Sequence, residues 1–259
     1  MKKICIIFLV MLAAFGLIAC TSNVNTNSDF EVEEDHFKSG SDDKNYIELS
    51  KIKDNIWVHT SYENYNGYRT PSNGMLVITS KGIVLVDTPW NNGQTKELLK
   101  LVKNVFKKDV TLTIITHAHV DRIGGIDTLL ENGIEAWSTS LTAQEAEKNG
   151  FSKPQPKLDT DPSITMGNVD FEIFYPGEGH SVDNITVWLP QHKVLFGGCI
   201  IKSLESKDLG STTDANIQEW PSSVEKVLEK YSDAEVVVPG HGNWGDVDLI
   251  EHTIELLEK

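Results

Sequence analysis

The chain has 259 residues, of which 39% are hydrophobic, enough for one large domain or two small ones with a substantial core. Its 38 acidic residues against 23 basic ones give a formal net charge of −15 at pH 7. Nucleic-acid binding and electrostatic attachment to anionic lipid both depend on clustered lysine and arginine. The composition therefore argues against a nucleic-acid partner, against a charge-driven membrane contact, and against a disordered or fibrous chain.

The first residues have the features of an export signal. Lys2 and Lys3 precede an apolar run over residues 4–18, which is short for a membrane-spanning helix. The letters LIAC at residues 17–20 resemble the bacterial lipoprotein signal, in which the cysteine becomes the lipid-bearing first residue. We therefore expect residues 1–19 to be a lipoprotein-type signal peptide, and a lipid on Cys20 to hold the exported protein in the cell envelope, on the periplasmic face or the outer surface of the membrane. The alternative is a plain secretory signal in which Cys20 has no role.

Residues 20–45 are rich in Asn, Ser, Asp and Glu and show no hydrophobic period, which predicts a flexible tether. Residues 46–259 alternate apolar runs of strand type with helical stripes, which predicts one α/β domain. Residues 61–74 contain glycine, proline and three tyrosines, and we expect a long binding loop there. The expected strands cover residues 56–60, 75–79, 83–86, 110–115, 134–137, 169–175, 185–189, 194–197 and 235–238, and the expected helices cover residues 93–108, 126–132 and 142–149, a segment from Pro221, and the C-terminus.

The letters THAHVDR at residues 116–122 follow the buried strand expected at residues 110–115. In extended backbone, alternate side chains leave on the same side, so His117, His119 and Asp121 can converge on one small volume. This spacing predicts a metal site that needs further ligands. The alternative is a strand end with ordinary surface histidines.

Three more residues that can bind a metal stand at the ends of expected strands, each directly after a glycine: His180, Cys199 and His241. Six ligands exceed the four that one zinc ion takes, so two ions with three protein ligands each are expected. Thiolate and imidazole favour zinc over magnesium or calcium. Cys199 would be the only free thiol of the mature chain, which makes an intramolecular disulfide impossible; its alternative reading is a small buried hydrophobe. No role is assigned to His36, His59, His192 or His252.

Asp87 also stands at a strand end, where its carboxylate could orient a metal ligand without touching the metal. The alternative is a helix cap or a turn residue.

Taken together, the ligands in this order resemble those of the metallo-β-lactamases, specifically the subclass with a cysteine in its second zinc site. The resemblance extends over residues 46–259 and implies a four-layer αββα sandwich. It assigns His117, His119 and His180 to the first of two zinc ions, and Asp121, Cys199 and His241 to the second. Most hydrolases of the wider superfamily have a histidine at the position of Arg122, and a bridging aspartate at that of Cys199. Arg122 would support the ligands without binding zinc.

The same resemblance implies the activity and the substrate contacts. A zinc-bound hydroxide would attack the β-lactam carbonyl of penicillins, cephalosporins or carbapenems, giving antibiotic resistance, with Asp121 orienting the nucleophile. Lys202 matches the lysine that receives the antibiotic's carboxylate, and Trp90 and residues 62–68 match the wall and the flap of the substrate site. Ser211 stands where relatives often have asparagine in contact with substrate. We expect a monomer.

Two alternatives belong to other functional classes. One is a thioester or phosphodiester hydrolase of the same superfamily, against which Arg122, Cys199 and the acidic charge argue. The other is a non-catalytic lipoprotein that binds or stores zinc, which would favour sites without a free coordination position.

Overall fold

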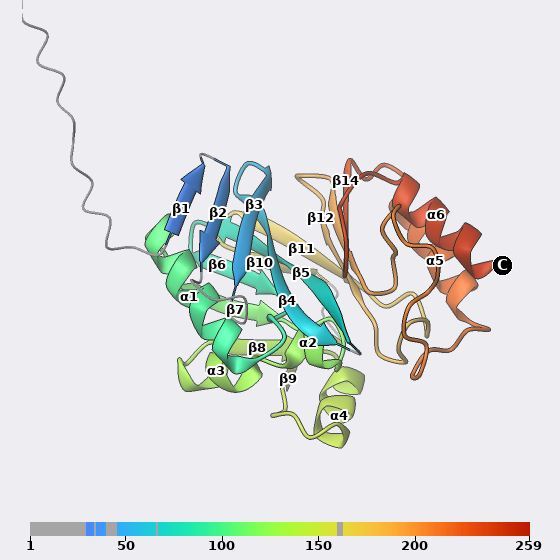
Figure 1. Ribbon diagram of the computed structural model, residues 1–259, viewed down its shortest axis with the longest axis horizontal. Helices are drawn as coiled ribbons and strands as arrows, with labels where there is room; N and C mark the ends of the chain where they lie inside the picture. The colour runs from blue at the N-terminus through green and yellow to red at the C-terminus, as the bar shows by residue number, and fades with distance from the viewer. Residues whose placement is uncertain (1–29, 34, 40–45, 66, 160–162) are drawn as a thin grey trace, which may run out of the picture.

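The computed structural model describes residues 30–33, 35–39, 46–65, 67–159 and 163–259, and within these residues the strands form two sheets (Figure 1). The first sheet contains, in spatial order, β1 (Phe30–Glu33), β2 (His36–Ser39), β3 (Ile47–Lys53), β4 (Ile56–Tyr65), β5 (Tyr68–Thr79), β6 (Gly82–Val86), β7 (Val110–Ile114), β8 (Glu135–Ser138) and β9 (Gln155–Pro156). Neighbours from β1 to β6 are antiparallel, and those from β6 to β9 are parallel.

The second sheet is shorter and mainly antiparallel. It contains, in spatial order, β10 (Ser163–Met166), β11 (Val169–Phe174), β12 (Thr186–Leu189), β13 (Val194–Gly198) and β14 (Val236–Pro239), with β13 and β14 parallel. The helices are α1 (Asn92–Phe106), α2 (Val120–Ile123), α3 (Ile126–Glu131), α4 (Ser140–Lys148), α5 (Trp220–Lys230) and α6 (Asp248–Leu257). Because parallel neighbours need a crossover, α1 connects β6 to β7, and α5 lies between β13 and β14.

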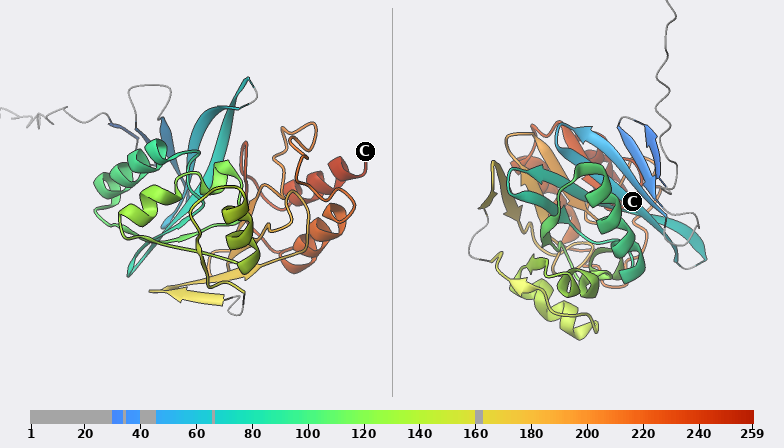
Figure 2. Two further views of the ribbon diagram at one scale, coloured as in Figure 1. Left: turned by 90° about the horizontal axis from the view of Figure 1, so that it is seen from below. Right: turned by 90° about the vertical axis from the view of Figure 1, so that its left-hand side faces the viewer.

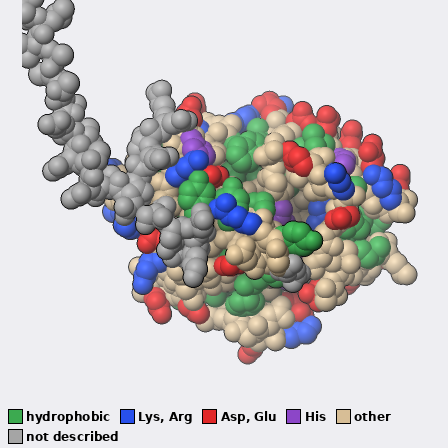
Figure 3. All heavy atoms as spheres, in the orientation of Figure 1, with side chains coloured by type: hydrophobic (Ala, Val, Ile, Leu, Met, Phe, Trp, Pro, Cys, Tyr) green, Lys and Arg blue, Asp and Glu red, His purple; other side chains and the backbone are tan. Residues whose placement is uncertain are grey.

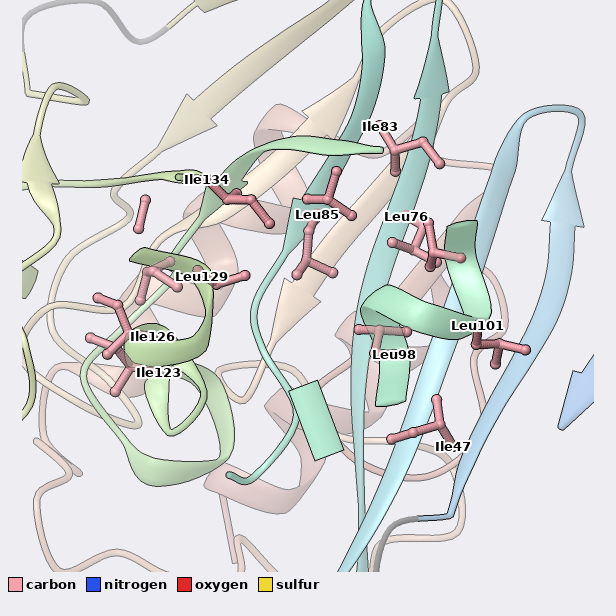
Figure 4. Close-up of a cluster of buried hydrophobic side chains, with 14 of the residues drawn as sticks. Ile47, Leu76, Ile83, Leu85, Leu98, Leu101, Ile123, Ile126, Leu129 and Ile134 are labelled. Atoms are coloured by element: carbon pink, nitrogen blue, oxygen red, sulfur yellow. The ribbon is translucent and has the colours of Figure 1, made fainter. Parts of the chain in front are cut away.

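Three hydrophobic clusters separate four layers. The central cluster lies between the sheets, where Val84 and Val86 of β6 share a core with Phe171 of β11. The alternate residues of β6, Ile83 and Leu85, face the opposite way and pack against α1 and α3, as Figure 4 shows. On the far side of the second sheet, α5 and α6 cover a third cluster that includes Trp220. Figure 2 shows this order of helix, sheet, sheet and helix, so the predicted αββα sandwich is confirmed.

Local sequence explains the ends of α1. The side chain of Asn91 accepts a hydrogen bond from the N–H of Gln94 at 2.9 Å, which satisfies one of the free donors of the first turn. The helix ends where Lys107 adopts the left-handed conformation, with φ 54°. Leu98 and Val102 of the apolar stripe are buried in the core together with Leu101, so the amphipathic pattern fixes which face is buried.

Two predictions about the N-terminal half are wrong. Residues 61–74 are not a loop, because β4 and β5 pair continuously from Ile56 opposite Val77 to Tyr65 opposite Tyr68. The proposed tether is also not unstructured throughout: β2 pairs with β3, and Phe37 packs against Trp57 with ring centroids 5.4 Å apart. Strands β9 and β10 were not predicted either.

The proposed signal peptide and Cys20 lie outside the described residues. Within the part of the chain that the structure describes, no helix has the length and apolar character needed to span a membrane.

Candidate metal centre

All six predicted ligands meet at one end of the sandwich, on segments that follow strands of both sheets. His117, His119 and Asp121 follow β7, and Asp121 lies in the first turn of α2. His180 lies between β11 and β12, the Cys199 residue directly follows β13, and His241 follows β14. Their metal-binding atoms form three overlapping groups in which all atoms lie within 4.8 Å of one another. Residues up to 124 positions apart therefore share one site, and their role as zinc ligands fits this geometry.

The Asp121, Cys199 and His241 side chains form a compact triangle. Cys199 Sγ lies 3.4 Å from His241 Nε2 and 3.7 Å from Asp121 Oδ2, and His241 Nε2 lies 3.2 Å from the same carboxylate oxygen. The other ring nitrogen of His241, Nδ1, donates to the carbonyl oxygen of Pro71 at 2.5 Å. This bond fixes the ring so that Nε2 points at the cluster, the arrangement usual for a metal-binding histidine.

The His117, His119 and His180 rings stand edge to face, with centroids 4.7, 5.0 and 5.2 Å apart. His119 Nδ1 and His180 Nε2 face each other at 3.1 Å. His117 Nδ1 lies 3.3 Å from Thr116 Oγ1, whereas His117 Nε2 is buried with no hydrogen-bond partner among the described residues. A buried polar atom without a partner is costly, and a cation among these nitrogens would satisfy it.

The charge states of these groups suit a cation with nitrogen and sulfur ligands. Burial, followed by the neighbouring histidines, holds the pKa of His117 well below its usual range, and burial with the charge of Lys202 does the same for His180. Burial acts to raise the pKa of Asp121, but the Arg122 guanidinium opposes it and the net pKa lies well below the ordinary value. The neutral imidazoles of His117 and His180, the ionised carboxylate of Asp121 and the Cys199 sulfur are donors that zinc prefers.

Arg122 is fully buried behind the second triangle. Its Nε and Nη2 atoms lie 3.0 and 2.8 Å from Asp121 Oδ2, and Nη2 also donates to the carbonyl of Gly240 at 2.7 Å. Nη1 donates to the carbonyl of Asn73 and lies 3.7 Å from Asp87 Oδ2. Arg122 thus compensates two buried carboxylates and joins three segments of the site, and support of the ligands stays the role predicted for it.

Asp87 connects the two ligand trios. Its Oδ1 accepts from the backbone N–H of Thr116 at 2.8 Å, and its Oδ2 accepts from the Thr116 hydroxyl at 2.7 Å. Thr116 in turn contacts His117, and the Asp87 carboxylate faces Arg122 on its other side. Burial raises the pKa of Asp87 to about 7 although Arg122 acts to lower it. Of the two readings of Asp87, the structure favours the one in which it orients ligands.

A cavity of about 400 Å³ opens over the metal centre, within the size range of small-molecule sites. Figure 3 shows a hollow near the middle of this face in which histidine and basic side chains are visible. Four of the candidate ligands line the cavity, namely His119, Asp121, His180 and His241, together with the predicted substrate residues Trp90, Lys202 and Ser211. The structure therefore brings Trp90, Lys202 and Ser211 to the same cavity, whereas of the predicted flap residues 62–68 only Tyr65 lines it.

Lys202 is 9% exposed and lies with Nζ 5.1 Å from the centroid of the Trp220 ring. Burial lowers its pKa, while the negative charges of Cys199 and Asp121 act in the opposite direction. A surface lysine would instead be solvated, so this position favours a lysine held ready for an anionic ligand.

The β4–β5 hairpin reaches the mouth of the cavity. Tyr65 near its tip lies with its ring centroid 5.6 Å from that of Trp90, and both residues line the cavity. This pair supplies apolar area next to the metal centre. The aromatic residues of this segment were expected at a flap, and the flap is a paired hairpin.

Two aspartates at the site were missed. Asp214 Oδ2 lies 3.3 Å from His119 Nε2, and Asp183 Oδ2 accepts from the N–H of Ala118 at 3.0 Å. Both carboxylates orient the segment that carries the first two histidines. Asp183 stands three residues after His180, which was a usable signal, whereas nothing in the sequence points from Asp214 to His119.

Comparison with known proteins agrees with this geometry. The metallo-β-lactamase superfamily profile matches residues 67–241. The metallo-β-lactamase type 2 of Bacillus cereus is 48% identical over 244 residues, 94% of this chain and 95% of that protein. Another of the same name from Bacillus sp. (strain 170) is 51% identical over 212 residues, 82% of each chain. The structure of a metallo-β-lactamase from Pontibacter korlensis superimposes with a TM-score of 0.80 at 41% identity, covering 82% of this chain and 99% of that one.

An αββα sandwich with overlapping groups of metal-binding side chains at an open cavity is the architecture of a metal-dependent hydrolase. The chain belongs to the metallo-β-lactamase superfamily. The predicted enzyme class, a zinc-type β-lactam hydrolase, is confirmed by these relatives.

Proposed function

We propose that the protein binds two zinc ions and hydrolyses the β-lactam amide of penicillins, cephalosporins and carbapenems. The observation that carries this proposal is the position of Lys202, buried at the edge of the cavity that the candidate ligands line. Penicillins, cephalosporins and carbapenems carry a carboxylate near the scissile amide. A site for this reaction suits such a substrate when a cation binds its carboxylate and a nearby metal centre binds its carbonyl.

The six candidate ligands would hold the two zinc ions. His117, His119 and His180 would hold the first zinc ion, and Asp121, Cys199 and His241 the second. When bound, zinc supplies Lewis acidity and lowers the pKa of water from 15.7 to about 7, so that a nucleophile exists at neutral pH.

Asp121 is kept ionised by the Arg122 guanidinium, so its carboxylate can accept a hydrogen bond from the attacking water and orient it. Lys202 would bind the substrate carboxylate, and Trp90 with Tyr65 would contact the apolar part of the substrate. The oxygen of water joins the carbonyl carbon and its proton goes to the ring nitrogen as the C–N bond breaks. No covalent bond to the protein is needed.

The test is hydrolysis of one carbapenem and one cephalosporin by a purified protein of residues 21–259, with added zinc and again after chelation, alongside measurement of bound zinc. We expect ring opening that stops on chelation and returns on adding zinc, at two zinc ions per chain. Protein that holds two zinc ions but opens neither ring would overturn the proposal. A thioester substrate assayed in parallel separates the related hydrolase activity from zinc binding without catalysis.

We also propose that the protein is exported and held in the cell envelope by a lipid on Cys20, and that it is a monomer. The charged start, the apolar run and the LIAC letters of the N-terminus support the anchor. Expression of the full chain and of a Cys20→Ala variant tests it. The unaltered chain should partition with membranes and the variant should not; equal partitioning of both would contradict the lipid anchor. Sedimentation of residues 21–259 tests the oligomeric state.

A further inference from the structure

His59 is a fully buried histidine of β4 to which the sequence assigned no role. Its Nε2 atom lies 3.1 Å from the backbone carbonyl oxygen of Asp87, which can only accept, so Nε2 carries the proton and donates. Its Nδ1 atom is buried with no hydrogen-bond partner among the described residues. A buried polar ring with one unpaired nitrogen costs stability that an apolar side chain would not, so the presence of a histidine here needs an explanation.

The chain is built to let this ring cross a neighbouring strand. His59 on β4 pairs with Gly74 on β5, and Met75 pairs with Val86, the last residue of β6 before Asp87. A Cβ atom on Gly74 would lie 2.1 Å from His59 Nε2. Because Gly74 has no side chain, the imidazole of His59 can extend from β4 across β5 to the end of β6.

Asp87 adopts a conformation that needs outside support. Its φ is 60°, in the left-handed region, which is sterically unfavourable for a residue with a Cβ atom. Two backbone hydrogen bonds hold it there: its N–H donates to Ile114 at 2.9 Å, and its carbonyl accepts from His59. In this conformation the carboxylate reaches Thr116 at 2.7 and 2.8 Å and faces Arg122 at 3.7 Å. Thr116 contacts His117 of the first ligand trio, and Arg122 pairs with Asp121 of the second. The Asp87 carboxylate therefore contacts one residue that supports each trio.

We propose that His59 is a positioning residue of the metal centre, which acts by holding Asp87 in its left-handed conformation so that the Asp87 carboxylate orients both ligand trios. The inference rests on the proposed two-zinc function. The ring suits this task because it donates a hydrogen bond without carrying a charge: burial lowers the pKa of His59 to about 4, so the ring is neutral in the physiological range and adds no positive charge near Arg122.

The test compares His59→Leu with His59→Gln in metal-free protein titrated with Zn²⁺ against a chromophoric chelator. Leucine fills the space without a donor, whereas the glutamine amide can place an N–H near the position of Nε2. We expect His59→Leu to weaken zinc binding at one or both sites by about tenfold or more, within the range found for residues that support metal ligands, and His59→Gln to stay within about threefold of the unaltered protein. The Co²⁺-loaded His59→Leu variant should also show altered absorption of the cysteine–cobalt bond.

A control separates positioning from general loss of stability. Leu101→Ala removes a buried side chain of α1 from the same face of the sheet and should lower the urea midpoint of unfolding. Its zinc affinity and cobalt spectrum should be those of the unaltered protein, although it unfolds more easily.

A second background tests whether His59 acts through Asp87. Asp87→Gly removes the carboxylate and tolerates the positive φ without support, so His59→Leu should then change zinc affinity less than about twofold. Unaltered zinc affinity and cobalt spectrum in His59→Leu alone, or an equal loss in the Asp87→Gly background, would overturn the inference. Failure of the unaltered protein to bind two zinc ions would instead overturn the proposed function.

Discussion

Asp121 and Arg122 are neighbours in the chain, and their side chains form a buried ion pair in which Arg122 Nη2 and Nε lie 2.8 and 3.0 Å from one carboxylate oxygen. That same oxygen, Oδ2, lies 3.2 Å from His241 Nε2 and 3.7 Å from Cys199 Sγ. The guanidinium therefore compensates the negative charge of Asp121, while the same carboxylate oxygen also faces the metal-binding atoms of His241 and Cys199. Two adjacent residues thus set the charge of the second ligand trio.

Removing the guanidinium with Arg122→Ala leaves the carboxylates of Asp121 and Asp87 buried without their cation. We expect the metal-free variant to lose about 3–5 kcal/mol of unfolding free energy, the usual cost of breaking a buried ion pair. Zinc should recover part of this loss because it supplies a positive charge next to Asp121. Urea unfolding with and without zinc measures both effects.

Arg69→Ala is the matched control, since Arg69 is exposed and lies over the Tyr62 ring. It should change stability by less than about 1 kcal/mol. A loss in Arg122→Ala no larger than in Arg69→Ala would contradict the role given to the buried pair.

Cys199→Ser replaces the thiolate of the second trio by a hydroxyl, a poor zinc ligand at neutral pH. Because Cys199 contacts Asp121 and His241, we expect selective loss of one zinc ion, with the three-histidine site still occupied. Zinc content after dialysis and titration with Co²⁺ report on this directly. Two retained zinc ions and an unchanged rate would mean that Cys199 is not a ligand.

Much of the architecture followed from hydrophobic periodicity. Strand β11 alternates buried and half-buried residues, and α1 has a single apolar stripe, so both were predicted close to their observed bounds. Gly67 and Pro71 weaken the strand pattern of the β4–β5 extension and favour a loop, but Pro71 pairs with Tyr62 across the two strands, and Gly67 lies in the turn between them. The preferences of single residues do not indicate that these two segments pair with each other.

The candidate site likewise has residues that the sequence predicts and residues that it does not. The six ligands could be found because each stands at a strand end in a recognisable local setting, with Gly before three of them. His59 and Asp214 could not be found, because their partners Asp87 and His119 are 28 and 95 positions away and no spacing connects them. Residues that support ligands are specified by the tertiary fold, whereas the ligands themselves carry short motifs.

Lys202→Met keeps the length and apolar stem of the side chain and removes its charge. If Lys202 binds the carboxylate of the substrate, KM should rise and kcat/KM should fall by about 10- to 100-fold, the value of a charged hydrogen bond of about 1.5–3 kcal/mol. The rate constant kcat should change much less, because the contact exists before and during the reaction. Steady-state kinetics with one cephalosporin is sufficient, with Lys226→Met as a control because Lys226 donates to the Pro176 carbonyl outside the cavity. A KM unaffected by Lys202→Met would contradict this assignment.

Zinc uptake should depend on pH through His241. In the metal-free protein, burial acts to lower the pKa of His241, but Cys199 and Asp121 raise it to about 9. The unfolded value is about 6.5, so protonation stabilises the metal-free fold fully below pH 6.5, and this contribution is lost as pH rises through 9. The side chain is 34% exposed, so solvent screening makes the effect smaller than the shift alone implies.

Zinc needs the unprotonated Nε2 lone pair, so binding at the second trio below pH 9 must release the His241 proton. We expect calorimetric zinc titrations in two buffers of different ionisation enthalpy to show more protons released at pH 7 than at pH 10. His252→Gln, which changes a histidine of α6 that is not among the candidate ligands, should leave this difference intact, whereas His241→Gln should reduce it. Proton release that does not vary between pH 7 and pH 10 would show that His241 is already neutral before zinc binds, and that Cys199 and Asp121 do not hold a proton on its ring.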